Sequence, residues 1–255
     1  MNPQPPAPSA TVRLFAPTKR DDQSSHLHRQ LVGWVALVLP ILLLIIAELR
    51  PTEGLPRREL LGSISAYYYT GAVAAFCGSL VALTAFFFTY RGYDNEHGRR
   101  DLQTAWIAGL ASLLVAFFPT TPPVIVLIPT WWTPWMRVIH YVSAMVLFGC
   151  LIYFSLVLFR KSSSEPKHRP PDKTWRNRCY FWCGVGMLAC MLWALSTYFT
   201  GGSIFWAEAI ALWLFAVSWL VKGRAGWTLM TVGRKTVHYV RHPQQAIPDL
   251  WGAIR

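Results

Sequence analysis

The stretch LVGWVALVLPILLLIIA, residues 31–47, decides the fold of this chain. It carries no charged side chain, and only Pro40 interrupts its apolar character. As an α-helix rising 1.5 Å per residue, it covers about 25 Å of a hydrocarbon core about 30 Å thick. Lipid offers no hydrogen-bond partners to the backbone, and a helix satisfies its own. The stretch therefore predicts a transmembrane helix with a kink at Pro40.

Five further apolar stretches of similar length follow along the chain. They are residues 67–90, 104–118, 138–159, 180–199 and 204–221. Apolar residues make up 53% of the chain and charged residues only 14%, a balance typical of membrane proteins. We expect an all-α polytopic membrane helix bundle with six transmembrane helices, which occupies residues 31–222.

The two ends of the chain lack such stretches. Residues 1–30 are polar and proline-rich and carry no cleavable signal, so they are expected to form a disordered tail. Residues 223–255 mix basic with aromatic residues, a composition suited to the surface of an anionic leaflet.

The basic residues indicate the orientation. Twenty of the twenty-four Lys and Arg residues fall in the two tails and in every other connecting segment between the six apolar stretches. Short basic segments stay on the cytoplasmic side, so both termini are expected in the cytoplasm and the protein in the cell inner membrane. The net charge of +12 follows this insertion rule, and the sequence has no nucleic-acid-binding motif.

Two pairs of residues have a helical spacing that metal ligands can use. Cys179 and Cys183 lie one turn apart, as do His238 and His242, but neither pair has further ligands in its vicinity, and Tyr239 stands where a zinc protease motif needs Glu. We predict no metal and no cofactor.

Polar side chains within apolar helices are rare and are candidates for function. Here they gather on the predicted outer side, in a candidate cluster that we expect to form a pocket. Its members are Ser63, Ser65, Tyr67, Tyr68, His140, Ser143 and Glu208. The apolar segment 119–135 is expected to lie in the interface or to fold over this pocket. The alternative is structural: an aromatic belt, with Glu208 neutralised by Arg137 or His140.

Several short motifs carry a resemblance. They are SISAYYYT at 63–70, YRGYD at 90–94, FP at 118–119, IHYVSA at 139–144, FWAE at 205–208 and SWLVKG at 218–223. In these the chain resembles a family of uncharacterised bacterial six-helix membrane proteins and is similar in layout to the domain-of-unknown-function 998 group. The resemblance implies an inner-membrane protein without an established activity. A more distant likeness to seven-helix membrane hydrolases such as alkaline ceramidases implies a three-histidine zinc site, of which the chain supplies only His140.

Three functions remain open from the sequence. The first is binding of a lipid, small ligand or partner at the outer cluster, without catalysis, by a protein that is a monomer or assembles with itself or another membrane protein. The second is a lipid-modifying hydrolase, with His140 as base and Ser63, Ser65 or Ser143 as nucleophile. The third is a small transporter, although the two halves of the chain show no convincing inverted repeat.

Overall fold

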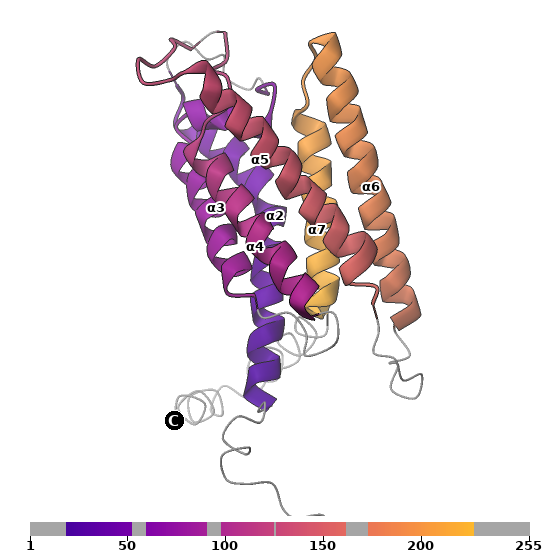
Figure 1. Cartoon of the computed structure of the whole chain (residues 1–255). Coiled ribbons are helices and arrows are strands. Elements are labelled where there is room, and N and C mark those ends of the chain that lie inside the picture. The colour runs from indigo at the N-terminus through magenta and orange to yellow at the C-terminus, as the bar shows by residue number, and fades with distance from the viewer. Residues whose placement is uncertain (1–18, 53–59, 91–97, 125, 162–172, 227–255) are drawn as a thin grey trace, which may run out of the picture.

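A computed structural model describes residues 19–52, 60–90, 98–124, 126–161 and 173–226, and within these ranges the regular elements are helices (Figure 1). Six of them are long or continuous enough to build a bundle. They are α2 (Lys19–Leu49), α3 (Val73–Phe88), α4 (Gly98–Phe117), α5 (Pro134–Tyr153), α6 (Lys173–Thr200) and α7 (Phe205–Lys222). A 3₁₀ helix, η1 (Ile64–Tyr69), precedes α3, and a π-helical segment, η2 (Phe154–Leu158), extends α5.

The helices pack as a closed ring in chain order, because each contacts the next and α7 contacts α2. The end of α7 lies beside residues 26–30 of α2, where the Gln30 side chain donates to the Gly223 carbonyl over 2.7 Å. We call this the basic end. The opposite end, which holds η1, the 118–133 segment and the α6–α7 turn, is called the loop end. Because the bundle has six helices that alternate in direction, the first helix begins and the last helix ends at the basic end.

Four helices are long and apolar enough to cross a membrane. They are α2 from His26 onward, α5 with η2, α6 and α7. The apolar helix α3 is shorter, and α4 begins with the charged residues Arg99, Arg100 and Asp101, which leave a shorter apolar remainder. The all-helical fold is thus confirmed, with four helices that could cross a membrane, whereas the count of six spans and the cytoplasmic termini stay predictions.

Two boundaries differ from the expected ones. Helix α2 begins at Lys19, so residues 19–30, which we expected in a disordered tail, are helical. At the end of this segment Arg29 and Gln30 are buried, and Gln30 donates to the Gly223 carbonyl after α7. Residues 1–18 and 227–255, with His238 and His242, lie outside the described part.

The second apolar stretch is not one helix. Its start forms η1, and a turn at Thr70 and Gly71 separates η1 from α3. The Thr70 hydroxyl donates to the Tyr67 carbonyl over 2.8 Å and accepts from the Ala72 amide over 3.1 Å, so it occupies backbone groups that a continuous helix would pair. Apolar composition alone does not reveal such a turn.

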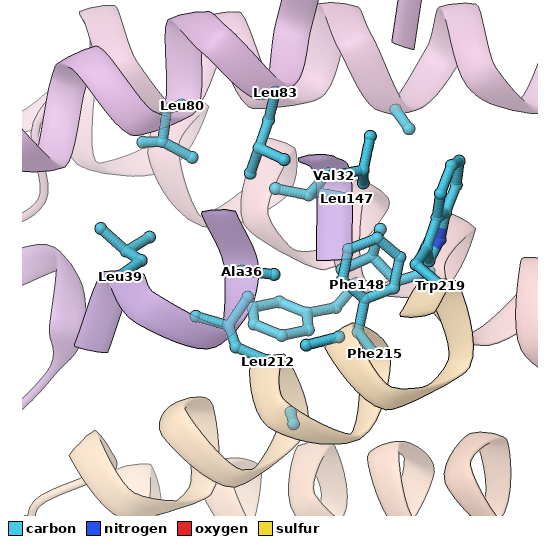
Figure 2. Packing of buried hydrophobic residues seen from close by; sticks show 14 of the residues in the cluster. Val32, Ala36, Leu39, Leu80, Leu83, Leu147, Phe148, Leu212, Phe215 and Trp219 are labelled. Carbon is cyan, nitrogen blue, oxygen red and sulfur yellow. The ribbon is translucent and has the colours of Figure 1, made fainter. Parts of the chain in front are cut away.

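The core runs along the axis of the ring, and Figure 2 shows side chains from four helices meeting there. Leu39 of α2, Leu80 of α3, Phe148 of α5 and Phe215 of α7 are all buried in it. Towards the basic end the core becomes aromatic, and the Trp219 ring contacts Phe87, Tyr90, Phe154 and Phe159 at centroid distances of 5.3 to 5.9 Å.

Gly71 lets the turn before α3 touch the end of α2. A Cβ atom there would lie 2.5 Å from the Arg50 carbonyl oxygen, a backbone atom that cannot rotate away. Gly71→Ala is therefore expected to lower the free energy of unfolding by about 2 kcal/mol, as overpacking does. Gly78→Ala is the control, because nothing lies within 4 Å of a Cβ at that helical position. Denaturation in mixed detergent and SDS micelles measures both, and equal stability of the two variants would contradict this account.

Candidate functional site

Glu208 binds backbone rather than another charged group. It lies in the first turn of α7, half-buried, and its Oε2 accepts from the Ile64 amide over 2.6 Å. The neighbouring Ile204 amide donates to the Gly62 carbonyl over 2.7 Å. These two bonds hold the segment before η1 against the start of α7. The pairing of Glu208 with Arg137 or His140, which the sequence left open as an alternative, stays a prediction; among the described residues its hydrogen-bond partner is the Ile64 amide.

His140 hydrogen-bonds to the backbone at the end of α4. The Phe118-Pro119 sequence ends this helix, because Pro119 has no amide hydrogen to continue it. The last carbonyls then lack intrahelical partners, which is costly away from water. His140, only 2% exposed, donates from Nδ1 to the Phe118 carbonyl over 2.6 Å, and the Val115 carbonyl also interacts with its ring. The Cys77 thiol donates to the Ala116 carbonyl over 3.6 Å.

Thr120 ties the segment after α4 to η1 and α5. Its carbonyl accepts from the Tyr69 hydroxyl over 2.6 Å and from Trp132 Nε1 over 3.1 Å. Its hydroxyl donates to the Tyr141 hydroxyl over 3.3 Å. Thr120 was not among the predicted site residues, and its only signal in the sequence is a polar residue directly after a proline that ends a helix. The polar groups of the loop end thus form a frame that fixes backbone segments.

Apolar side chains project from this frame. Val124 and Leu127 are essentially fully exposed, Ile128 is 67% exposed and Trp131 is 51% exposed. The Trp131 ring also contacts the half-buried Tyr68 of η1, with centroids 6.4 Å apart. We call Val124, Leu127, Ile128 and Trp131 the loop-end patch. Its composition suits lipid contact rather than contact with water.

The remaining predicted residues lie at the loop end but do not form one catalytic group. Ser63 caps η1 by accepting from the Ala66 amide over 3.1 Å. Tyr67 is buried against Phe205. Ser65 and Ser143 are buried, and in the described part of the chain neither is hydrogen-bonded to His140. Likewise, no hydrogen bond joins His140 to Glu208 among the described residues.

A second polar group lies at the basic end, where the sequence was interpreted only as a topology signal. Arg29, Asp101 and Lys222 are buried there, although they come from three different helices. Lys222 also interacts electrostatically with Lys173 and Arg176 of α6. A signal was present in the sequence: Lys173 and Arg176, like Trp219 and Lys222, are three residues apart and share a helix face.

Comparison with known proteins does not extend this picture. No family model matches the chain, and neither a curated protein nor a solved structure does. Among the described residues, no three His, Cys, Asp or Glu side chains come together as a metal site would need. The resemblance to uncharacterised bacterial membrane proteins stays a prediction, and the helical bundle with its two polar ends is the basis for inference.

Proposed function

We propose that this protein is a six-span protein of the cell inner membrane, with both termini in the cytoplasm, whose loop end binds lipid of the outer leaflet. The observation that carries the proposal is the loop-end patch. Fully burying one Leu or Val side chain is worth about 1.5 to 3 kcal/mol, so leaving several in water would be unfavourable. Lipid at the interface accepts both these aliphatic chains and the amphipathic Trp131 ring.

The frame beneath the patch supports binding over catalysis. His140 donates from Nδ1 to a carbonyl, and Ser63 is engaged as a helix cap. A hydrolase needs its base within hydrogen-bond reach of a nucleophile. The hydrogen bonds of the described residues instead hold η1 and the 118–120 segment in place beneath the patch. We therefore give the polar residues a positioning role.

Cysteine labelling of intact cells tests both the orientation and the lipid contact. Thr121→Cys and Leu127→Cys place thiols at two exposed positions of one loop, one polar and one in the loop-end patch. A membrane-impermeant maleimide should label Thr121→Cys readily in intact cells. It should label Leu127→Cys much more slowly, because lipid excludes the reagent and disfavours the thiolate. The wild-type protein, with five cysteines inside helices, sets the background.

Arg99→Cys, at the exposed start of α4, is the orientation control and should label only after lysis. Labelling of Arg99→Cys but not of Thr121→Cys in intact cells would overturn the orientation. Equal labelling rates for Thr121→Cys and Leu127→Cys would overturn the lipid contact.

A further inference from the structure

Four basic side chains lie together at the basic end, and we call them with Asp101 the basic-end cluster. They are Arg29, Lys173, Arg176 and Lys222. They come from α2, α6 and α7, so that the ring of helices, not one stretch of sequence, assembles them. Asp101 of α4 is the acid that interacts with Lys222 among the described residues.

One backbone carbonyl serves two of these cations. The Phe159 carbonyl, just past the end of η2, accepts from both Lys222 Nζ and Lys173 Nζ, each over 3.4 Å. A carbonyl at the C-terminus of a helix attracts cations because of its unpaired oxygen and the helix dipole. Two ammonium groups that share it lie within about 7 Å of each other, where like charges repel. An anion between them would relieve that repulsion.

Two buried donors at the basic end make no hydrogen bond within the part of the chain that the structure describes. Lys161 Nζ is one of them, although the Lys161 carbonyl accepts from Lys173 Nζ over 3.1 Å. Trp219 Nε1 is the other, on a side chain that is 0% exposed. Buried donors are nearly always paired, so each such N–H indicates an acceptor beyond the described residues, as a bound anion would be.

Aromatic rings form the floor beneath these groups. Lys222 Nζ lies 4.9 Å from the centre of the Phe159 ring, and Arg29 lies 5.9 Å from that of Tyr90. Trp219 contacts both rings, so the three rings form one aromatic group beneath the cations. The floor keeps water away from the charges and strengthens their attraction for an anion.

We propose that the basic-end cluster binds a phosphate group. Phosphate accepts hydrogen bonds on several oxygens at once and suits convergent Arg and Lys donors from different helices. The phosphate group can belong to the headgroup of an anionic phospholipid or to free phosphate in solution. Basic pockets between membrane helices are known to bind such headgroups. Either source neutralises the cluster and joins α2, α6 and α7, so binding stabilises the bundle.

The test uses purified full-length protein in nanodiscs of phosphatidylcholine alone or with phosphatidylglycerol. Thermal unfolding is followed in both, and inorganic phosphate is titrated into the phosphatidylcholine sample. Arg176→Gln removes a cluster cation, and Arg178→Gln, exposed on the same helix, makes the same change of charge outside the cluster. Trp219→Phe removes the unpaired N–H but keeps an aromatic ring. Native mass spectrometry reports the lipid retained by each variant.

We expect one of the two phosphate sources to raise the unfolding temperature. Arg176→Gln and Trp219→Phe should weaken that response, Arg176→Gln by roughly tenfold in apparent Kd, whereas Arg178→Gln should leave it unchanged. A response to phosphatidylglycerol alone assigns a lipid headgroup, and a response to inorganic phosphate assigns a soluble anion. The proposal is overturned if neither source stabilises the protein, or if Arg176→Gln and Arg178→Gln behave alike.

Discussion

Replacing His140 by Ala is expected to lower the free energy of unfolding by about 3 kcal/mol, the largest effect among the substitutions considered. The loss has two parts. The Phe118 carbonyl loses its 2.6 Å hydrogen bond in a region away from water, and an almost fully buried ring leaves a cavity between α4 and α5. Unfolding in mixed detergent and SDS micelles measures the change.

His140→Asn separates the two parts. Its side-chain amide nitrogen lies close to the position of the imidazole Nδ1 and can still donate to Phe118, so we expect about half of the loss. Arg137→Ala, one turn earlier on α5 and exposed, should change stability by less than about 0.5 kcal/mol. If His140→Asn were as unstable as His140→Ala, the hydrogen bond to Phe118 would not be what His140 contributes.

Replacing Glu208 by Ala is expected to lower the free energy of unfolding by about 2 kcal/mol. A charge-assisted bond of 2.6 Å to the Ile64 amide is lost, and that amide is left without an acceptor in a buried position. Glu208→Gln keeps an oxygen that can accept from the amide, so its effect should be about half as large. The same micelle unfolding assay compares the two variants.

Ser203→Ala is the matched control for Glu208. Its hydroxyl also contacts the segment before η1, donating to the Gly62 carbonyl over 3.3 Å, but from an exposed position where water can replace it. A small effect of Ser203→Ala beside a large one of Glu208→Ala is the expected pattern. If Glu208→Ala and Glu208→Gln lowered the free energy of unfolding equally, the hydrogen bond from the Ile64 amide would not be what Glu208 contributes to stability.

The sequence predicted the helices well because apolar length is a local property. The four helices that are long and apolar enough for a membrane each cover one of the predicted stretches to within one residue. The prediction was weakest for residues 67–90, where the Thr70 and Gly71 turn interrupts the expected helix. At that turn Gly71 lies against Arg50 at the end of α2. A pattern within residues 67–90 does not reveal a contact with a residue from another helix.

The sequence predicted at which helix end the candidate residues lie, but not their contacts, and their role as a binding site stays a prediction. His140 and Glu208 do lie at the same end of the bundle, as their positions within the helices suggested. The partners of these two side chains, the Phe118 carbonyl and the Ile64 amide, could not be predicted from the sequence. Both are backbone groups at places where helical hydrogen bonding is interrupted. A sequence pattern shows which side chains are polar, but it does not show which carbonyls or amides lack a partner.

The basic-end cluster is a second case in which the sequence did not reveal the contacts between side chains. Arg29, Lys173 and Lys222 stood out in the sequence only as charges that flank apolar stretches. In the bundle Lys173 and Lys222 share the Phe159 carbonyl, and Arg29 and Lys222 lie over aromatic rings. Flanking charge is a feature of one helix end, whereas convergence depends on how several helix ends pack together.

The sequence by itself determined that the chain is helical and that its apolar stretches suit a membrane. Both properties belong to single segments, because a helix pairs its own backbone N–H and C=O groups and its apolar length is that of one stretch. It also determined which polar residues lie near which helix end. Only the tertiary structure decided what these residues do. The closed ring of helices brings Glu208 to Ile64, His140 to Phe118 and the basic residues to one another. Each of these contacts joins groups from separate segments, and their geometry arises only when the segments pack.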